Sequence, residues 1–425
     1  MNIMVLGSGG REHTLVWKIS QSPKAGKIYA VPGNPGMKKY AECIQADIED
    51  NDAVVALAKE KKIDLVVVGP EVPLVNGIVD ALTEAGIKAF GPTKSAAELE
   101  GSKVYAKVVM RRYGIPTAKS EVFGDIGRAR VYVRQMRQPF AIKADGLAAG
   151  KGVILTQTVD EAIEAIDTIM QEKAFGDAGS RIVIEEFMQG EEASLLCFTD
   201  GKTIVPMVSS QDHKRVNDGD EGLNTGGMGA YAPAPVMTPD MLERVRKEIL
   251  EPVVEGMNKE GRPYKGCLYA GLMITAKGPK VVEFNARFGD PETQVVLPLL
   301  KSDIVDIMLS CIDGTLDEQS IEWSGGAAAC VIMASGGYPG AYEKGKVITG
   351  LEDAEKAGTL VVHAGTKEEN GAILTNGGRV LGVIGEADDI RGAVAKAYDG
   401  VAKIHFEGEH HRSDIAHRAL ERLQK

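Results

Sequence analysis

The sequence predicts a multidomain protein of mixed α/β and α+β class, in which an open parallel sheet precedes units with antiparallel strands. Three observations support this prediction. Apolar strands alternate with helical stretches over about the first 102 residues, as in a parallel βαβ sheet. A glycine-rich loop lies between two strands in 139–155, and a strand with alternating polar residues begins at Val281. The 425 residues suffice for several domains, each with its own core.

The strands predicted in the N-terminal region are 3–6, 28–31, 65–68 and 89–90. The turn Gly7-Ser-Gly-Gly-Arg-Glu12 joins the first strand to a helix, whose N-terminus favours an anion. It begins like a dinucleotide fingerprint, but Glu12 occupies the third glycine position. Pro32-Gly33 stands where a ribose-binding acid would follow the second strand. These departures disfavour a nicotinamide-dependent dehydrogenase, and a connection without a ligand stays open.

A glycine-rich hairpin is predicted from strands 140–143 and 153–156. The hairpin carries Lys143, Gly146, Gly150, Lys151 and Gly152. Glycines let backbone N–H groups approach an anion closely, and the lysines add positive charge. The spacing differs from a P-loop, since glycine stands where Ser or Thr would bind magnesium. The functional interpretation is a flexible lid over phosphates, and an ordinary hairpin turn is the alternative.

Two neighbouring segments also suit a nucleotide. The apolar strand 181–185 ends in an acidic linker, whose backbone can meet an adenine edge. Glu192 follows and can bind ribose hydroxyls. The stretch 95–113 is predicted to be helical and contains Lys103. Each signal alone is weak, because most such acids and lysines are solvated. Their order along the chain carries the weight.

The segment 281–292 is the most informative one. Side chains at i, i+2 and i+4 of a strand share one face, so Glu283, Asn285 and Arg287 are expected at one spot. Mg²⁺ takes one or two protein oxygens together with substrate phosphates, and arginine grips a phosphate through paired hydrogen bonds. Asp290 and Glu292 follow in a turn near the same site. A solvated edge strand is the alternative.

The segment 209–235 is predicted to be long, irregular and glycine-rich, with the polar residues Asp212, His213 and Lys214. Loops of this length are usually functional or disordered, and the residues alone leave both open. From about 325 onward, strands are predicted at 327–335, 360–364 and 380–385, with a helix at 388–402. No catalytic group of residues is recognisable there.

Composition narrows the class of partner. A net charge of −11 disfavours nucleic acid or an anionic membrane. Five cysteines are scattered singly, without metal-type pairing, which suggests reduced thiols in the cytoplasm. No apolar run is long enough to span a membrane, and we expect no signal or transit segment before the first strand. The protein is expected to be a monomer.

The ordered segments resemble the ATP-grasp superfamily. Five motifs resemble its glycinamide ribonucleotide synthetase family, namely those at 7–13, 68–71, 211–215, 224–231 and 287–294. The resemblance implies a Rossmann-like substrate-binding domain at 1–102 and an ATP-grasp catalytic domain at 103–121 and 191–324. It also implies an ATP lid subdomain at 122–190 and a small β-rich domain at 325–425.

The resemblance further implies ATP-dependent ligation of glycine to 5-phosphoribosylamine through glycyl phosphate, in de novo purine biosynthesis. The implied metal is Mg²⁺ or Mn²⁺, held by Glu283 and Asn285. The implied catalytic residues are Arg287, Lys143 and Asp212. The implied ATP-binding residues are Lys103, Lys143, Gly146, Gly150, Lys151, Gly152, Glu185, Glu186, Met188 and Glu192. The implied substrate-binding residues are Gly9, Gly10, Arg11, Glu71, Asp212, Lys214, Gly226, Gly227, Met228, Gly229, Arg287, Asp290 and Glu292.

One departure from the superfamily concerns the metal. Many relatives carry another acidic ligand on the strand before Glu283, where this chain reads Leu268-Tyr-Ala-Gly-Leu272. The number of metal ions therefore stays open. Two other functions also stay open: an ATP-grasp ligase for a different carboxylate and amine, and a nucleotide-binding regulatory module without turnover.

Overall fold

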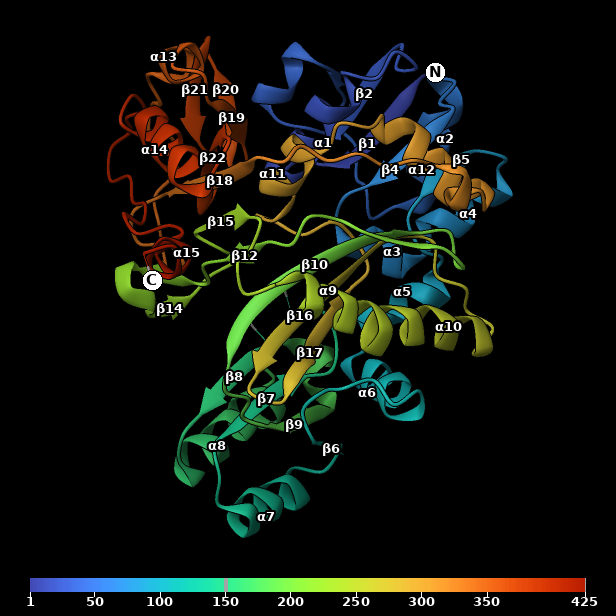
Figure 1. Ribbon diagram of the computed structural model, residues 1–425, viewed down its shortest axis with the longest axis vertical. Coiled ribbons are helices and arrows are strands. Elements are labelled where there is room, and N and C mark those ends of the chain that lie inside the picture. Colours follow the sequence, from blue (N-terminus) through green and yellow to red (C-terminus); the bar gives the residue numbers. More distant parts are fainter. Residues whose placement is uncertain (149–151, 425) are drawn as a thin grey trace.

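The computed structural model describes residues 1–148 and 152–424. Figure 1 shows an N-terminal α/β unit beside a C-terminal unit, a central sheet below them, and a separate lobe at the bottom. The predicted mixed fold class is confirmed. Among the described residues, no helix combines the length and apolarity required to cross a membrane.

The N-terminal sheet is entirely parallel and has the order β3-β2-β1-β4-β5. Its strands are β1 (Ile3–Gly7), β2 (Ile28–Pro32), β3 (Glu42–Cys43), β4 (Leu65–Val68) and β5 (Lys88–Phe90). Its helices are α1 (Gly10–Ile19), α2 (Asn51–Glu60), α3 (Glu71–Asn76) and α4 (Ile78–Glu84). The four predicted strands are confirmed, and the two-residue β3 is additional. Continuous apolar runs suit these strands because both sheet faces are covered.

Two capped helices lead out of this unit. α5 (Lys94–Gly101) and α6 (Lys103–Arg112) confirm the helical prediction for this stretch. The Ser102 side chain accepts a hydrogen bond from the Tyr105 N–H, which caps α6 and places Lys103 in its first turn. The Ser102 cap therefore determines that Lys103 lies at the start of α6.

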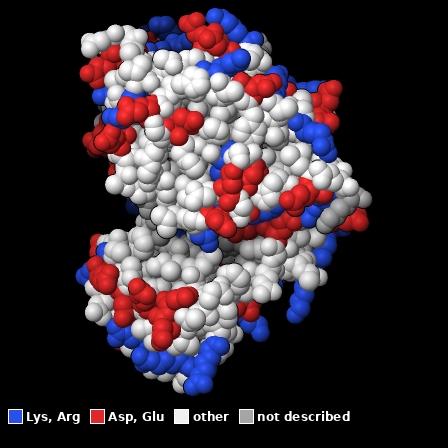
Figure 2. Space-filling model, turned by 90° about the vertical axis from the view of Figure 1, so that its left-hand side faces the viewer, with Lys and Arg blue, Asp and Glu red and all other residues white. Residues whose placement is uncertain are grey.

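The lid sheet lies in the bottom lobe of Figure 1 and has the order β6-β9-β7-β8. Its strands are β6 (Ser120–Phe123), β7 (Phe140–Ala144), β8 (Val153–Thr156) and β9 (Ile182–Glu186). It is packed by α7 (Ile126–Met136) and α8 (Val159–Ile166). β7 and β8 pair antiparallel from Phe140↔Thr156 to Lys143↔Val153, so the predicted hairpin is confirmed. Figure 2 shows this lobe set off from the main body by an indentation, with acidic and basic patches interspersed.

The central sheet is antiparallel, with the order β11-β10-β16-β17. Its strands are β10 (Glu191–Thr199), β11 (Ile204–Pro206), β16 (Gly266–Thr275) and β17 (Gly278–Asn285). α9 (Pro239–Val245) and α10 (Glu251–Lys259) flank it, while α11 (Thr293–Val296) and α12 (Ile304–Asp313) follow it in sequence. One apolar cluster contains residues of this sheet, of the N-terminal sheet and of α6.

A third sheet, here called the shared sheet, has the order β12-β15-β18-β22-β19. Its strands are β12 (Gln211–Asp212), β15 (Gly229–Ala232), β18 (Ala327–Ala334), β19 (Leu360–His363) and β22 (Arg379–Ala387). The remaining strands form two hairpins, from β13 (Arg215–Asn217) with β14 (Glu221–Asn224) and from β20 (Thr366–Glu369) with β21 (Ala372–Thr375). α13 (Leu351–Lys356), α14 (Ile390–Val401) and α15 (His417–Arg422) complete the C-terminal unit.

The prediction that 209–235 is irregular was wrong, because four short strands lie within it. The pairing partner explains the error. β15 pairs antiparallel with β18, about a hundred residues away in sequence. The residues around β15 do not indicate such a distant partner. Gly229 allows the approach, because an added Cβ would lie 2.6 Å from the Cys330 carbonyl oxygen. The shared sheet thus joins strands from both sides of the boundary proposed at 324/325, and the domain boundaries themselves stay predictions.

Candidate active site

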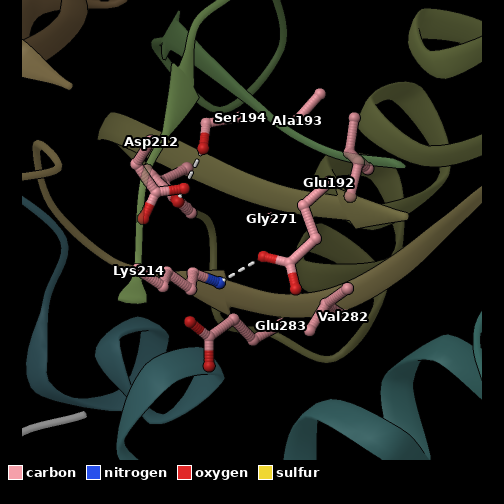
Figure 3. Close-up of a pocket in the computed structure, with 10 residues that line it drawn as sticks. Glu192, Ala193, Ser194, Asp212, Lys214, Gly271, Val282 and Glu283 are labelled. Carbon is pink, nitrogen blue, oxygen red and sulfur yellow. Dashed lines mark hydrogen bonds and ion pairs between the residues drawn. The ribbon is translucent and has the colours of Figure 1, made fainter. Parts of the chain in front are cut away.

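A small polar cavity lies between β10, β16, β17 and the segment that follows β12 (Figure 3). Its lining consists of Glu192, Ala193, Ser194, Asp212, Lys214, Tyr269, Gly271, Leu272, Val282 and Glu283. The Lys214 Nζ lies 2.6 Å from the Glu192 Oε2, and Glu283 lies beside this pair. The cavity therefore brings together residues predicted to bind ribose, substrate and metal.

Several positively charged side chains lie close to Glu283. Burial opposes its ionisation, but Lys214, Lys143 and Lys103 hold its pKa below the ordinary value. The three lysines come from separate segments, so the fold has gathered them around one carboxylate. Glu283 lies opposite Gly271 in the register of β16 and β17. A carboxylate kept ionised here is a suitable cation ligand.

Asn285 lies two residues further along β17 and on the same face as Glu283. A carboxylate and an amide oxygen fit Mg²⁺, which binds few protein oxygens and takes its other ligands from phosphates and water. Within residues 1–148 and 152–424, no group of three or more His, Cys, Asp or Glu residues has a metal-binding arrangement. Glu283 and Asn285 therefore suit a metal ion that substrate helps to hold.

Lysine side chains connect the lid sheet with α6 and the central sheet. Lys143 on β7 donates a hydrogen bond to the Val282 carbonyl at 3.0 Å and lies 3.0 Å from the Glu185 Oε2. Lys103 donates to the Gly146 carbonyl at 3.1 Å, and burial lowers the pKa of Lys103. Of the predicted phosphate-binding lysines, Lys103 therefore contacts the loop after β7, and Lys143 contacts β17.

Lys107 was missed by the sequence analysis. Its Nζ lies 2.9 Å from the Glu185 Oε1 and donates to the Thr117 hydroxyl at 2.8 Å. The available signal was its spacing, because a residue four positions after Lys103 faces the same side of α6. Glu185, expected to meet the adenine amino group, has each carboxylate oxygen in contact with a lysine. We call Lys103, Lys107, Lys143, Glu185 and Glu283 the nucleotide end.

The other predicted nucleotide residues have mixed surroundings. Gly146 and Gly152 allow close packing, since added Cβ atoms would lie 2.8 Å from the Ala178 Cβ and 2.5 Å from the Ala148 Cβ, respectively. Glu186 accepts a hydrogen bond from the Lys119 N–H and forms an ion pair with Lys280 at 3.2 Å. Met188 lies in the connection from β9 to β10. Gly150 and Lys151 lie outside the described residues.

The prediction that Arg287 shares the strand face of Glu283 and Asn285 was wrong, because β17 ends at Asn285. The Ala286 N–H donates to the buried Glu100 carboxylate at 2.7 Å, so it leaves the strand ladder. Arg287 lies 3.1 Å from the Glu71 Oε2 and 3.0 Å from the Glu100 Oε1. Its guanidinium is therefore held by the N-terminal unit, although its charge also lowers the pKa of Glu283.

Asp290 lies at the N-terminus of α1. Its Oδ2 accepts from the Arg11 N–H at 3.2 Å, and its Oδ1 accepts from the Gln294 side chain at 2.9 Å. Gly9 and Gly10 lie in the same turn, where Glu12 accepts from the Gly9 N–H at 2.8 Å. A carboxylate of the chain itself therefore occupies part of the helix terminus that was predicted to bind substrate.

Asp212 and Glu292 are both buried acids. Glu292 accepts a hydrogen bond from the Tyr269 hydroxyl at 3.0 Å. Burial raises the pKa of Asp212 to about 7, against the positive charge of Lys214, and the charge of Glu292 adds to the rise. Asp212 can therefore change its protonation state near neutral pH.

The segment Gly226–Gly229 leads into β15 and was predicted to bind substrate. The Met228 N–H donates to the His213 carbonyl at 2.7 Å, and the His213 N–H donates to the Gly229 carbonyl at 2.9 Å. These bonds tie the segment to Asp212 and Lys214. We call the residues predicted to bind substrate the substrate end: the segments Gly9–Arg11, Gly226–Gly229 and Asp290–Glu292, together with Glu71, Asp212, Lys214 and Arg287.

The parallel N-terminal sheet, the hairpin lid and the lysines around Glu283 together define an ATP-grasp protein. Three family models match the chain: the phosphoribosylglycinamide synthetase N domain over 1–100, its ATP-grasp (A) domain over 101–293 and its C domain over 328–418. These matches cover most of the sequence. The chain belongs to the phosphoribosylglycinamide synthetase family, as the motifs predicted.

Individual relatives agree over the full length. A phosphoribosylamine–glycine ligase of Halalkalibacterium halodurans is 53% identical, with 99% of this chain and 97% of that protein covered. One from Vibrio vulnificus is 51% identical over 100% of both chains. The crystal structure of the Thermotoga maritima phosphoribosylamine–glycine ligase matches with a TM-score of 0.86 and 36% identity, covering 97% and 100% of the two chains.

A more distant match concerns the fold alone. The biotin carboxylase domain of the Hydrogenobacter thermophilus 2-oxoglutarate carboxylase, solved with MgADP, ADP and bicarbonate, has a TM-score of 0.75 at 17% identity. The match covers 96% of this chain and 91% of that one. The overall fold is therefore shared by proteins of very different sequence.

Proposed function

We propose that this protein joins glycine to 5-phosphoribosylamine with consumption of ATP, giving glycinamide ribonucleotide, ADP and phosphate. The observation that carries the proposal is that Lys103, Lys143 and Lys214 all lie close enough to the half-buried, cavity-lining Glu283 to lower its pKa. This arrangement lies in a chain that matches phosphoribosylamine–glycine ligases from end to end. The reaction belongs to purine biosynthesis.

At the nucleotide end, Lys103 and Lys143 would neutralise the ATP phosphates, and the β7–β8 hairpin would cover them. Glu283 and Asn285 would hold Mg²⁺ or Mn²⁺, which would supply positive charge to the terminal phosphates. The contacts of Lys107 and Lys143 with Glu185 support a fixed carboxylate beside the nucleotide. Positioning and charge neutralisation would account for most of the catalysis.

At the substrate end, the first step makes glycine an acyl donor. A glycine carboxylate oxygen attacks the terminal phosphorus of ATP, the bond to the bridging oxygen breaks, and ADP leaves. The positive charge of Arg287 would favour this transfer, because it is close enough to Glu283 to lower the pKa of that carboxyl. Asp212 and Lys214 line the cavity and would orient glycine.

In the second step the amine nitrogen of phosphoribosylamine attacks the glycyl carbonyl carbon. The bond from carbon to the phosphate oxygen then breaks, phosphate leaves with the electron pair, and the nitrogen loses a proton. The turn at Gly9–Arg11 and the segment Gly226–Gly229 would hold the phosphoribosyl part. The Arg11 N–H is bonded to Asp290, and Gly227 lies against Pro291, so both segments meet at the same turn, which supports this placement.

We further propose that the protein acts as a monomer in the cytoplasm, with small molecules as its substrates. The mixed charge pattern in Figure 2 and the net charge of −11 favour small molecules over nucleic acid. Light scattering of the purified protein with and without ATP would check the monomer, and a mass of twice 45.3 kDa would contradict it.

The decisive assay is phosphate release from ATP with Mg²⁺, with and without glycine and freshly prepared phosphoribosylamine. We expect release that requires both substrates, and glycinamide ribonucleotide as product by mass spectrometry. Release with another carboxylate but not with glycine would retain an ATP-grasp ligase and overturn the substrate assignment. Nucleotide binding without any turnover would point to a regulatory module.

A further inference from the structure

Arg379 is the first residue of β22, in the C-terminal unit, where sequence analysis found no functional residues. Its Nη1 donates to the Gly226 carbonyl at 2.8 Å and lies 3.2 Å from the Asp290 Oδ1. The side chain is only 22% exposed. A largely buried guanidinium from the C-terminal unit therefore contacts two segments of the substrate end.

The glycines at 226 and 227 explain how the segments come so close. An added Cβ at Gly226 would lie 3.0 Å from the Arg379 Cζ. At Gly227 it would lie 2.5 Å from the Pro291 Cδ, and φ there is +114°, a conformation that favours glycine. The backbone therefore lies directly against the guanidinium and the turn after Asp290.

A second C-terminal residue supports the same segment. The Gly226 N–H donates to the Tyr338 hydroxyl at 3.0 Å, so both backbone groups of Gly226 are bonded to the C-terminal unit. Tyr338 itself packs on Gly378, where an added Cβ would lie 2.2 Å from its ring. Arg379 and Tyr338 therefore hold this peptide from two directions.

Asp290 extends the connection to the N-terminal unit. Arg379 contacts its Oδ1, while its Oδ2 accepts from the Arg11 N–H at the start of α1. Burial opposes ionisation of Asp290, but the charges of Arg379 and Arg11 hold its pKa below the ordinary value. One carboxylate thus joins the three parts of the chain that match the N, A and C family models.

We propose that Arg379 is a positioning residue for phosphoribosylamine, which holds the Gly226–Gly229 segment directly and the α1 turn through Asp290. This inference rests on the proposed function and deepens it. Both segments would hold the phosphoribosyl part, whereas the nucleotide end lies on β7, β9, β17 and α6. Loss of the guanidinium should therefore weaken phosphoribosyl binding selectively. It also leaves the largely buried Asp290, 17% exposed, without its ion-pair partner Arg379.

The experiment compares Arg379→Ala, Arg379→Lys and the control Arg391→Ala. Arg391 is an exposed arginine on α14 of the same unit. Calorimetry would measure the Kd of glycinamide ribonucleotide and, separately, of a non-hydrolysable ATP analogue with Mg²⁺. Steady-state assays would give KM for phosphoribosylamine and for ATP. The phosphoribosyl product serves as the probe because it is chemically stable.

For Arg379→Ala we expect glycinamide ribonucleotide to bind about 10- to 100-fold more weakly, as for a lost charged hydrogen bond. The KM for phosphoribosylamine should rise correspondingly, while the ATP analogue binds within about twofold of normal. Arg379→Lys, which keeps the charge but not the forked geometry, should show a smaller loss of the same kind. Arg391→Ala should resemble the unsubstituted protein.

Unchanged affinity for glycinamide ribonucleotide in either Arg379 variant would overturn the proposal. A parallel loss of affinity for both ligands with a lower Tm would also overturn it, since it would reveal a purely structural role. Should Arg379→Ala fail to fold, Arg379→Lys decides by the same criteria. Failure of the proposed function is distinguishable, because the unsubstituted protein would then neither bind glycinamide ribonucleotide nor consume phosphoribosylamine.

Discussion

The two ends of the candidate active site are built differently. At the nucleotide end, lysines surround Glu185 and Glu283, and these residues lie on α6, the lid sheet and the central sheet. At the substrate end, Arg287 is paired with Glu71 and Glu100, and Asp290 is paired with Arg379 of the C-terminal unit. The nucleotide end thus presents excess positive charge for phosphates. The substrate end uses ion pairs to hold separate parts of the chain together.

Because the two ends are built differently, amino-acid substitutions at each end should affect different steps of the reaction. A change at the nucleotide end alters the charge that meets ATP, so its effect should fall on the phosphoryl chemistry. A change at the substrate end alters the alignment of segments, so its effect should fall on binding of the amine. The predictions below test that distinction, beginning with the largest expected effect.

Glu283→Ala should abolish turnover, with kcat reduced roughly 1000-fold or more, because the proposed metal ligand is lost and three lysines nearby lose their counter-charge. The protein should still fold, since Glu283 lies at a cavity rather than in the apolar core. Phosphate release and circular dichroism would be measured together, with Glu283→Gln as the matched control for charge. Near-normal activity of the alanine variant at saturating Mg²⁺ would contradict the metal assignment.

Lys143→Ala should lower kcat/KM for ATP by about 10- to 100-fold, because it removes a cation near Glu283 that we propose neutralises the ATP phosphates. The KM for glycine should change little. Lys107→Ala is the matched control, since Lys107 contacts the same Glu185 but is not among the charges that lower the pKa of Glu283. If both variants lose ATP turnover equally, Lys143 has no role in neutralising the phosphates beyond its contact with Glu185, and the prediction is wrong.

Glu100→Gln should raise the KM for phosphoribosylamine by about three- to tenfold with little effect on the KM for ATP. The amide keeps an acceptor for the Ala286 N–H but loses the ion pair with Arg287. Arg287 keeps Glu71 as its partner, so the change should be moderate. Steady-state kinetics would decide. An effect confined to the KM for ATP would show that Arg287 acts on the phosphoryl transfer alone and not on binding of the amine.

Asp212→Asn tests a stability effect rather than catalysis. Because the folded-state pKa of Asp212 is raised to about 7, the native state binds this proton more tightly than the unfolded chain. Its stabilising contribution is complete below the unfolded pKa of about 4 and is lost as pH rises through about 7. The asparagine variant should therefore gain stability relative to the unsubstituted protein as pH rises.

Thermal melts at pH 5 and pH 8 would measure this change. The relative gain between pH 5 and pH 8 should be at most about 3 kcal/mol, because only the range from pH 5 to about pH 7 contributes. Lys214 and Glu192 adjoin Asp212, so Glu192→Gln is a useful companion variant. A difference in Tm that does not vary with pH would show that Asp212 titrates normally.

The sequence predicted the nucleotide end more fully than the substrate end, and particular residues show why. Glu283 and Asn285 follow from the two-residue period of a strand, and the β7–β8 hairpin follows from its apolar flanks and glycines. Arg287 could not be placed, because β17 ends where Ala286 turns to Glu100 of a distant helix. Local pattern does not reveal such a partner.

The same limit applied to the segment 209–235. Its polar, glycine-rich sequence resembles a loop, yet β15 pairs with β18 and the segment after β12 is bonded to Gly229. Arg379 was missed for a similar reason, since an arginine at the start of a strand is usually solvated. Only the contacts with Gly226 and Asp290 distinguish it.

The shared sheet also limits how this chain can be divided into fragments. A cut at 324 would remove β18 and leave the outer backbone groups of β15 without their partners. A bare strand edge of this kind invites pairing between molecules and aggregation. Fragment expression, domain exchange or split-protein designs should therefore keep β15 and β18 on the same piece, even though roughly a hundred residues separate them in sequence.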